Sequence, residues 1–415
     1  MVETDRPVPK CRFCATPVKR EFIDLGFAPP SNAYLSAKEL TAPESWYPLR
    51  VIVCDACWLF QTEDYSRPQE LFSEDYAYFS SVSKSWLRHC REFCEEISAK
   101  LKLGRDSFVL EIGSNDGYLL ANFVEAGVPC LGVEPTLAAA RASEQLGVPV
   151  CHEFFGPALA KKLATEGYFA DLIIANNVFA HVPDINGFAE GMKTLLKQGG
   201  TVSIEFPHLL NLVQKAQFDT VYHEHYSYLS LAAVERILRA RGLKVLDVEE
   251  IETHGGSLRV FSSHLDDPRQ QSRNVSRILA LEEAQGLFDP DVFRKVQERA
   301  EITKYNLIEF LIQEKRAGKR TVAYGAAAKG NTLLNFAGIK SDLVEVCYDG
   351  ARSKQGKFLP GSHIPILPPP EGMSIDADNI LILPWNLSSE IVPMLRGSVG
   401  FRSNLYTAVP DLMRI

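Results

Sequence analysis

The chain has 415 residues, 46% of them hydrophobic, which is enough for two or three domains with sizeable cores. Asp and Glu number 52 against 44 Lys and Arg, and the resulting net charge of −8 makes a polyanion such as nucleic acid an unfavourable partner. No run of 18 apolar residues is present and the N-terminal residues contain no secretory apolar segment, so we expect a cytoplasmic protein with no membrane partner.

Four of the nine cysteines form two C-x-x-C pairs, Cys11 with Cys14 and Cys54 with Cys57. Two intervening residues let both thiolates of a pair face one ion, and four sulfurs complete a closed tetrahedral zinc shell. In a cytosolic chain this pattern favours metal over disulfides, and the βαβ context of a redox pair is missing. The sequence therefore predicts one structural zinc ion per chain, in a zinc-binding domain over residues 1–75.

Residues 58–83 are rich in aromatic and hydroxyl side chains. Ser83 is predicted to cap a helix over residues 84–101. Tyr76 and Tyr78 lie on one side of this segment if it is extended, so both are candidates to reach a ligand. Simple packing would also explain them.

The segment FVLEIGSNDG, residues 108–117, predicts a buried strand followed by a ligand-binding turn. Gly113 and Gly117 allow close approach of a ligand to the backbone, with Glu111 and Asn115 before and between them. Glu134 ends the next apolar run, where a carboxylate can hold ribose hydroxyls. The absence of Gly-x-Gly-x-x-Gly counts against a dinucleotide. The segment resembles motif I of class I S-adenosylmethionine methyltransferases; the alternative is an ordinary strand–turn–helix.

Strands and helices continue to alternate through the domain that we place at residues 76–267, as in a doubly wound parallel sheet. Two further strands joined by a short turn predict a final antiparallel pair, as in the class I methyltransferase sheet. The expected strands are 130–134, 148–152, 172–176, 201–206, 244–251 and 257–264.

Polar residues follow the fourth and fifth strands, at the edge where open α/β sheets bind ligands. Asn177 and His181 follow the fourth strand; a turn-forming Asn and a helix-capping His would explain them equally well. A denser cluster follows the fifth strand. Its spacing lacks the i, i+4 pair of a helical zinc site, so we exclude a catalytic metal and expect proton transfer by a histidine. Its members are Asp219, Tyr222, His223, Glu224, His225, Tyr226 and Tyr228.

If the cluster is extended, His223 and His225 point the same way and Glu224 the other way. Spacing alone therefore does not decide which histidine is the base.

A second α/β unit is predicted at residues 268–415. It begins with a polar linker of helical character at 268–288 and a long helix over 292–316, and strands follow at 321–324, 345–348 and 380–383. Lys329 and Asn331 open the helix after the first of these strands, where small residues and a lysine form an anion cradle. The unit is thus a candidate to hold a nucleoside diphosphate, with Arg352 a weaker candidate ligand; a purely structural Rossmann-like unit is the alternative.

These blocks, in this order, resemble the deoxysugar C-methyltransferase family over essentially the whole chain. The motifs that carry the resemblance are the four cysteines, YAYFSSVS at 76–83, EIGSNDG at 111–117, NNVFAHVPD at 176–184, YHEHYSY at 222–228 and THGGSLRV at 253–260. The similarity is greatest to C-3-methyltransferases that act on nucleotide-linked 4-keto-deoxysugars in antibiotic biosynthesis.

The resemblance implies S-adenosylmethionine as methyl donor and an enolate mechanism. His225 would remove the proton next to the C-4 ketone, and Tyr222 and Glu224 would orient or polarise. Tyr76 and His181 would line the pocket.

The remaining site residues follow from the same expectations. The donor would be held by Glu111, Gly113, Asn115, Gly117, Glu134 and Asn177. The nucleotide-sugar substrate, with a dTDP sugar favoured, would contact Tyr78, Ser83, His254, Ser257, Lys329, Asn331 and Arg352. An O- or N-methyltransferase of a sugar or small metabolite, and a non-enzymatic zinc-ribbon adaptor with a degenerate methyltransferase fold, are the alternatives. The oligomeric state is left open, with a monomer favoured.

Overall fold

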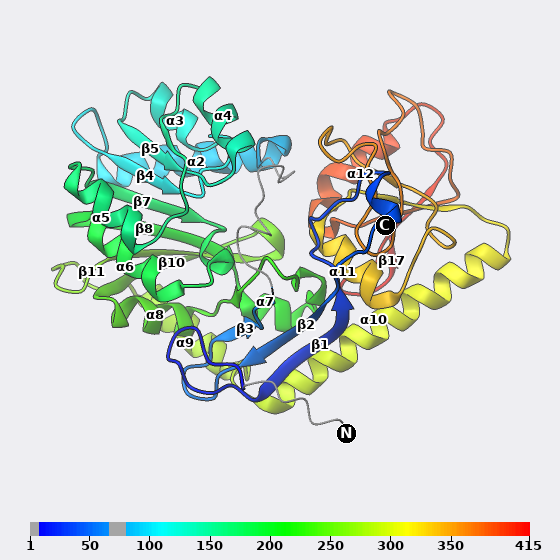
Figure 1. Cartoon of the computed structure of the whole chain (residues 1–415), viewed down its shortest axis with the longest axis horizontal. Helices are drawn as coiled ribbons and strands as arrows, with labels where there is room; N and C mark the ends of the chain where they lie inside the picture. The colour runs from blue at the N-terminus through cyan, green and yellow to red at the C-terminus, as the bar shows by residue number, and fades with distance from the viewer. Residues whose placement is uncertain (1–7, 66–79) are drawn as a thin grey trace.

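The computed structural model describes residues 8–65 and 80–415 and contains three sheets. Tyr76 and Tyr78 lie outside these described residues. The methyltransferase and C-terminal domains lie side by side, and the N-terminal strands lie between and below them (Figure 1). Among the described residues, no helix is both long and apolar enough to cross a membrane.

The N-terminal sheet is antiparallel and takes its last strand from another part of the chain. β1 (Arg20–Ala28), β2 (Tyr47–Val53) and β3 (Phe60–Thr62) are joined at one edge by β9 (Ser227–Tyr228). Phe60 pairs with Tyr228 and Gln61 with Ser227. The end of the predicted cluster at 219–228 therefore joins the sheet of the N-terminal domain.

The central sheet has seven strands in the order β10-β11-β8-β7-β4-β5-β6. Six strands run in the same direction, and β11 runs antiparallel to them between β8 and β10. This order and the antiparallel β11 confirm the expected class I methyltransferase fold. The strands are β4 (Val109–Ile112), β5 (Cys130–Val133), β6 (Val150–Cys151), β7 (Ala170–Asn176), β8 (Leu196–Pro207), β10 (Leu243–Ile251) and β11 (Ser257–His264).

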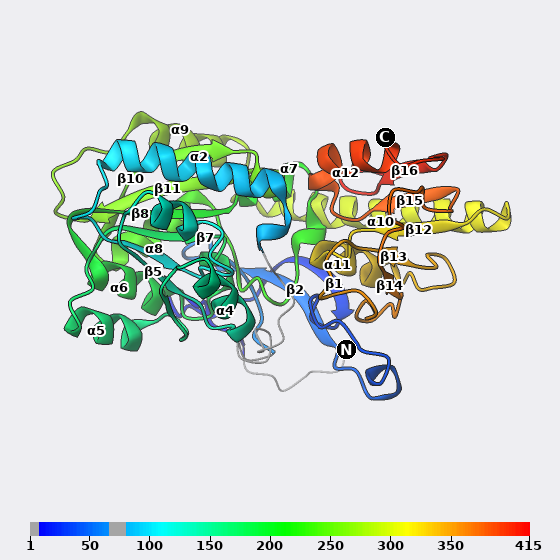
Figure 2. The same cartoon turned by 90° about the horizontal axis from the view of Figure 1, so that it is seen from above.

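Helices cover both faces of this sheet because its strands are apolar on both sides. In β7, Leu172 and Ile174 pack in one core with α2 (Lys84–Leu101) and α3 (Leu120–Glu125). Ile173 and Ala175 pack in the other core with α5 (Pro157–Thr165), α6 (Ile185–Leu195) and α8 (Leu231–Ala240). Figure 2 shows α2 along one side of the sheet and α5 and α6 on the other. α4 (Leu137–Gln145) follows β5, and α7 (Leu209–Gln214) follows β8.

Residues 268–288, where the sequence predicts a linker with helical character, contain a packed helix instead. α9 (Arg273–Ala284) lies against α8 and β10, with Val275 and Ile278 fully buried in the methyltransferase core. Its Glu282 accepts hydrogen bonds from the amides of Leu231 and Ala232 at the start of α8. The contact could not be predicted from so polar a sequence, because one of the buried residues is a carboxylate that caps α8.

The C-terminal sheet has six strands in the order β14-β13-β12-β15-β16-β17, all parallel except β17. The strands are β12 (Thr321–Tyr324), β13 (Cys347–Tyr348), β14 (Ile366–Leu367), β15 (Asn379–Ile382), β16 (Asn404–Thr407) and β17 (Met413–Arg414). The helices of this domain are α10 (Pro290–Arg316), α11 (Ala328–Ala337) and α12 (Ser388–Arg396).

The long helix α10 connects the domains. Its Phe293 packs edge-on against Phe22 and Phe60, with ring centroids 5.4 Å apart in both pairs, so that one core spans the N-terminal sheet and the C-terminal domain.

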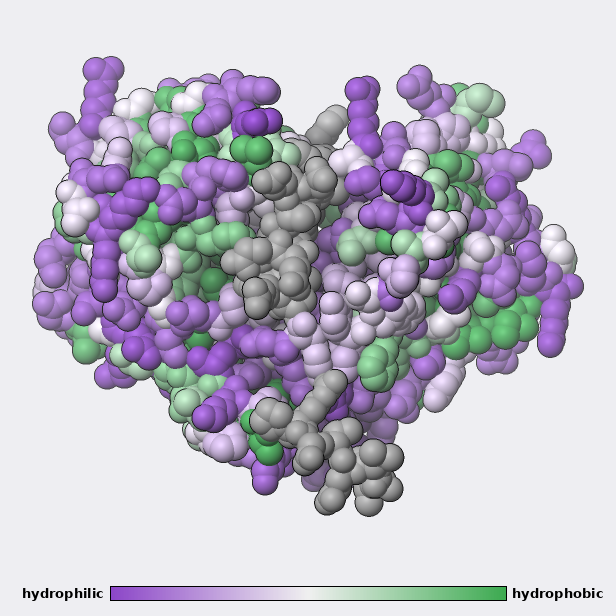
Figure 3. All heavy atoms as spheres, viewed as in Figure 1, coloured by the Kyte–Doolittle hydropathy of each residue, from purple (hydrophilic) through white to green (hydrophobic). Residues whose placement is uncertain are grey.

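On the face drawn in Figure 3 the surface is mostly polar, with an apolar patch where α10 runs. Ile302 and Tyr305 of this helix are more than half exposed.

Candidate active site at the junction of three domains

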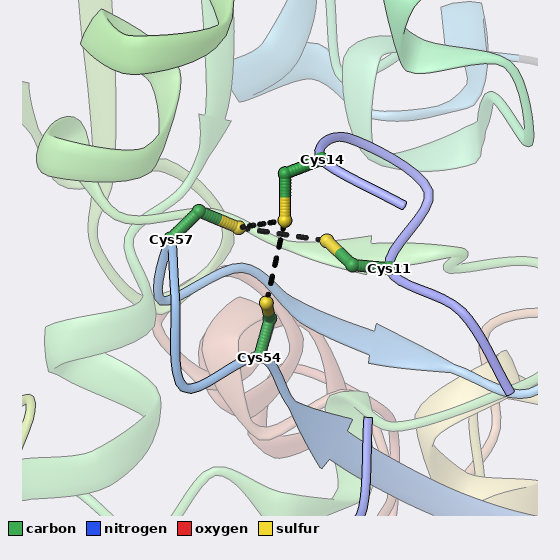
Figure 4. Close-up of side chains that lie close together, drawn as sticks. All are labelled: Cys11, Cys14, Cys54 and Cys57. Atoms are coloured by element: carbon green, nitrogen blue, oxygen red, sulfur yellow. Dashed lines mark hydrogen bonds between the residues drawn. The ribbon is translucent and has the colours of Figure 1, made fainter. Parts of the chain in front are cut away.

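The four N-terminal cysteines converge as the sequence predicts (Figure 4). Their sulfurs all lie within 4.8 Å of one another, and the Cys11–Cys57, Cys14–Cys54 and Cys14–Cys57 pairs are 3.5, 3.5 and 3.6 Å apart. A tetrahedral zinc ion with Zn–S bonds of about 2.3 Å needs sulfurs about 3.8 Å apart, whereas a disulfide needs about 2.05 Å. The set therefore fits zinc. Four thiolates take every position of a tetrahedral ion, which makes the ion structural.

The zinc-binding loops also hold the neighbouring helices in place. Arg236 of α8 donates to the Cys57 carbonyl at 2.7 Å, and Asn186 of α6 donates to the carbonyls of Arg12 and Phe13. The metal site thus fixes the N-terminal sheet against the methyltransferase domain.

The predicted donor loop is tightly packed, which explains its glycines. Gly113 has φ +70°, and a Cβ there would lie 2.4 Å from Val178 Cγ2. Gly117 has φ +78°, and a Cβ there would lie 2.5 Å from Ser143 Oγ. No side chain fits at either position without displacing its neighbour. Because neither glycine carries a side chain, a ligand can approach the backbone of this loop closely.

Two buried carboxylates flank this loop. Glu134 accepts hydrogen bonds from the Asn115 amide at 2.9 Å and from the amide and hydroxyl of Thr136. Burial raises the pKa of Glu134, and the Thr136 and Asn115 donors oppose that shift. Glu111 is 1% exposed, and burial followed by the nearby Glu134 charge raises its pKa well above the ordinary value. Among the described residues its Oε2 has no hydrogen-bond partner.

Asn177 lies where the sequence predicts, directly after β7, and it has φ +55°. Its amide donates to the Glu205 carbonyl at 2.7 Å, which holds the turn. Both side-chain polar atoms are buried and have no partner in the described part of the chain. Unpaired buried donors and acceptors fit the polar groups of S-adenosylmethionine, because a bound ligand would remove their desolvation cost.

The residues that precede α2 meet this loop. The Ser80 amide donates to Asn115 Oδ1 at 2.9 Å, and the Ser81 amide to Asp116 Oδ2 at 3.3 Å. Ser83 caps α2 as predicted, accepting from the Trp86 amide.

His225 lies in a hydrogen-bond geometry that fixes its tautomer. Its Nδ1 is 3.0 Å from the Thr220 carbonyl, which can only accept, so Nδ1 carries the proton. Its Nε2 is 2.8 Å from the Tyr222 hydroxyl and accepts from it. Burial, followed by the nearby His181, lowers the pKa of His225 well below 6.5. The imidazole is therefore neutral at physiological pH, with its lone pair on Nε2.

His181 packs edge-on against His225, with ring centroids 4.6 Å apart. Its Nδ1 is 2.7 Å from the Glu224 carbonyl, so it too carries its proton on Nδ1. Burial lowers the pKa of His181 to about 4. The structure thus brings His181, Tyr222 and His225 together.

His223 does not share this environment. The expectation that His223 and His225 point the same way assumes an extended chain, but residues 223 and 224 form a turn. His223 Nε2 is 3.2 Å from the Pro48 carbonyl, and its ring packs on Tyr47 of the N-terminal sheet. This orientation separates it from the His181–Tyr222–His225 cluster.

Glu224 is 1% exposed and reaches the N-terminal domain. Its Oε1 accepts from the amide and side-chain nitrogens of Asn32, at 3.1 and 3.2 Å. Burial raises the pKa of Glu224, opposed by these donors. Its Oε2 is without a partner among residues 8–65 and 80–415.

The C-terminal domain brings Lys329 to the same junction. Lys329 Nζ donates to Asn386 at 2.7 Å and lies 4.6 Å from the centre of the Trp385 ring. The Trp385 indole donates to Asp219 at 2.7 Å. Burial raises the pKa of Asp219 to about 6, and the nearby Lys329 opposes that rise. Burial also lowers the pKa of Lys329.

The other predicted substrate residues differ in their surroundings. His254 has φ +54° and packs on Trp86, with centroids 5.2 Å apart, and burial lowers its pKa to about 4. Ser257 is buried and donates to the Thr253 carbonyl. Asn331 is also buried, and its side chain donates to the Ser31 carbonyl at 2.6 Å. Arg352 is exposed.

Sequence reasoning missed a buried network beside His254. Glu205, at the carboxyl end of β8, accepts from the Thr253 hydroxyl, His89 and Arg259 at 2.9, 3.2 and 3.1 Å. Burial opposes ionisation, yet His89 and Arg259 lower the pKa of Glu205. Its place at a strand end is the signal that could have found it. The same signal applies to Trp385, which follows β15.

Three family models match consecutive parts of the chain. They are described as "Putative zinc binding domain" over residues 11–72, "Methyltransferase domain" over 85–248 and "C-methyltransferase C-terminal domain" over 252–410. The C-methyltransferase NovU of Streptomyces niveus is 32% identical over 94% of this chain and 93% of its own length. The mitochondrial ubiquinone biosynthesis O-methyltransferase of Homo sapiens is 25% identical over 34% of this chain and 42% of its own. A solved magnesium protoporphyrin IX methyltransferase from Synechocystis PCC 6803 with bound S-adenosylmethionine covers 48% of this chain and 99% of its own, at 13% identity and a TM-score of 0.36.

Proposed function

Because this chain belongs to the C-methyltransferase family and is an S-adenosylmethionine-dependent enzyme, we propose that its acceptor is C-3 of a nucleotide-linked 4-keto-deoxysugar. A dTDP sugar of antibiotic or other deoxysugar biosynthesis is the acceptor that the family resemblance favours. The observation that carries the proposal is the buried, neutral His225, whose unprotonated Nε2 lies in the same cluster as Tyr222 and His181.

The chemistry requires a base before it requires a methyl donor. C-3 becomes nucleophilic only when a proton next to the C-4 ketone is removed and an enolate forms. His225 suits this step because the Thr220 carbonyl holds the proton on Nδ1, so the basic lone pair is on Nε2, where it accepts from the Tyr222 hydroxyl in this structure. S-adenosylmethionine, when bound, supplies an electrophilic sulfonium methyl group, and the protein then contributes mainly position.

The neighbours of His225 have distinct polar roles in this proposal. Tyr222 donates to Nε2 and orients the imidazole. His181 packs edge-on against the base, and the Glu224 carbonyl holds its Nδ1 proton. Glu224 offers the buried Oε2 as an acceptor to a sugar hydroxyl. A buried acceptor close to the base suits a hydroxylated sugar ring.

We assign Lys329 as the cation that binds the diphosphate of the substrate, and Arg352 is a weaker candidate for this role. Support comes from the position of Lys329 at the start of α11, above Trp385, whose indole contacts Asp219 of the base-bearing segment. The strand edge of the C-terminal domain is meanwhile occupied by the protein itself. Asp349 accepts from the Ala326 amide at 2.6 Å, and the Tyr34 hydroxyl donates to the Ala326 carbonyl at 2.6 Å. We therefore assign the nucleotide to the shared junction.

The test is proton exchange at C-3 of a candidate dTDP-4-keto-deoxysugar in deuterated buffer without methyl donor. The wild type is expected to wash deuterium into C-3, and His225→Asn to lose about 10²–10⁴-fold in exchange rate, the usual contribution of general-base catalysis. His223→Asn is the matched control, because His223 contacts the Pro48 carbonyl instead of the cluster. Wild-type exchange in His225→Asn, or an O- or N-methylated product in the carbon spectrum, would refute the proposal.

A further inference from the structure

The short segment that precedes the turn at residues 223–224 is held from both sides by the C-terminal domain. It comprises η4 (Phe218–Thr220) and Val221. On one side the Trp385 indole donates to Asp219 Oδ2 at 2.7 Å. On the other, the Thr332 hydroxyl of α11 donates to the Val221 carbonyl at 2.8 Å. Between these two contacts lies Thr220, whose carbonyl accepts the Nδ1 proton of His225.

Both contacts are sheltered from water. Asp219 and Val221 are 0% exposed and Thr332 is 1% exposed. Phe218 packs edge-on against Phe336 of α11, with ring centroids 5.6 Å apart. A buried hydrogen bond is costly to lose, because the abandoned carbonyl or carboxylate has no water to replace its donor. The C-terminal domain therefore sets where the Thr220 carbonyl points.

We infer that Trp385 and Thr332 are positioning residues that fix the tautomer of His225 through the Thr220 carbonyl. This inference rests on the proposed role of His225 as base. While the carbonyl holds the Nδ1 proton, Nε2 keeps its lone pair. When the carbonyl moves away, the proton is free to occupy Nε2, and an imidazole with that tautomer cannot accept a substrate proton there.

A merely adhesive role for these contacts makes a different prediction. If Trp385 and Thr332 only attach one domain to another, removing either bond lowers stability and leaves the imidazole unchanged. The chain offers a matched control for that case. Thr303 of α10 is 2% exposed and its hydroxyl donates to the Pro410 carbonyl at 3.0 Å, within the C-terminal domain. Thr303→Val and Thr332→Val thus remove the same kind of buried bond.

The experiment measures the His225 tautomer by nitrogen NMR of full-length protein labelled with ¹⁵N-histidine. The chain has nine histidines, and His225→Asn identifies the signals of His225 by their loss. The wild type and Thr303→Val are expected to show a protonated Nδ1 and an unprotonated Nε2. Trp385→Phe and Thr332→Val are expected to show a growing population with the proton on Nε2. Thr332→Val keeps the shape of the side chain, so it covers the case in which Trp385→Phe folds poorly.

Kinetics provide the second readout. C-3 exchange and kcat should fall about 3- to 10-fold in each variant, the worth of one hydrogen bond. In Thr332→Val, which leaves the contact between Trp385 and Lys329 in place, KM and donor affinity should be unchanged. Unchanged tautomer and unchanged exchange in both variants would overturn the inference, and so would a rise in KM alone. The two proposals can be refuted separately. Normal exchange in His225→Asn would refute the role of His225 as base, whereas unchanged tautomer spectra would refute the control of that tautomer by the C-terminal domain.

Discussion

Replacing Gly113 by alanine tests whether the loop after β4 holds the methyl donor. The new Cβ would lie 2.4 Å from Val178 Cγ2, whereas ordinary contacts begin at 3.4 Å, so the two groups must separate by about 1.0 Å. Val178 follows Asn177, whose side-chain amide is buried and has no partner among the described residues. The substitution therefore moves both sides of the predicted donor pocket.

The substitution has two costs, and the chain allows them to be separated. The first is the left-handed backbone, about 1–2 kcal/mol for any residue with a Cβ. The second is the displacement of Val178. Gly127 also has φ +70°, but a Cβ added there would meet no atom within 4 Å, so Gly127→Ala carries the first cost alone. The difference between Gly113→Ala and Gly127→Ala isolates the displacement.

Denaturant unfolding and calorimetric titration of S-adenosylmethionine are the two measurements. Gly127→Ala should lose about 1–2 kcal/mol of unfolding free energy and bind the donor normally. Gly113→Ala should lose more stability and also bind the donor about 10- to 150-fold more weakly, as when one charge-assisted hydrogen bond of about 1.5–3 kcal/mol is lost. Wild-type donor affinity in a folded Gly113→Ala protein would place the donor elsewhere.

Four further outcomes are expected. Glu134→Ala should weaken donor binding by about 1.5–3 kcal/mol, and unchanged calorimetry would remove Glu134 from the ribose. Cys54→Ser, or chelation, should lower stability together with the zinc content, and a stable zinc-free protein would contradict a structural ion. Lys329→Ala should raise KM for the sugar nucleotide and leave donor affinity alone; an effect on the donor only would place the lysine elsewhere. The folded pKa values of His181 and His254 are about 4 against 6.5 unfolded, so the unfolded state binds more protons in that window and unfolding free energy should fall as pH drops from 6.5 to 4. Replacing both histidines by Gln should flatten that slope.

Local patterns sufficed for the elements whose partners are close in sequence. Buried parallel strands are continuous apolar runs, so residues 108–112, 130–134 and 172–176 predict β4, β5 and β7. The cysteine pairs are equally readable, because tetrahedral zinc imposes its own spacing on thiolates. The strand expected at 148–152 is reduced to Val150 and Cys151, at the edge of the sheet.

Contacts between distant segments could not be predicted in this way. β9 pairs with β3, more than 160 residues earlier, and this pairing buries the cluster that the sequence left on an open strand edge. His223 and His225 lie in different environments because a turn at residues 223–224 interrupts the alternation of an extended strand. The contact of Trp385 with Asp219 could not be predicted either, because the indole comes from the C-terminal domain.

Residues 218–225 form a polar loop that is almost completely buried, and buried backbone polar groups require partners. The N-terminal domain supplies one, because the Thr62 hydroxyl donates to the His225 carbonyl at 3.0 Å. The methyltransferase domain supplies another, because His181 donates to the Glu224 carbonyl. The C-terminal domain supplies a third, through the Thr332 hydroxyl on Val221. Removing any one domain would leave a buried carbonyl of this loop unpaired, so the base can be held in its observed position only by the assembled chain.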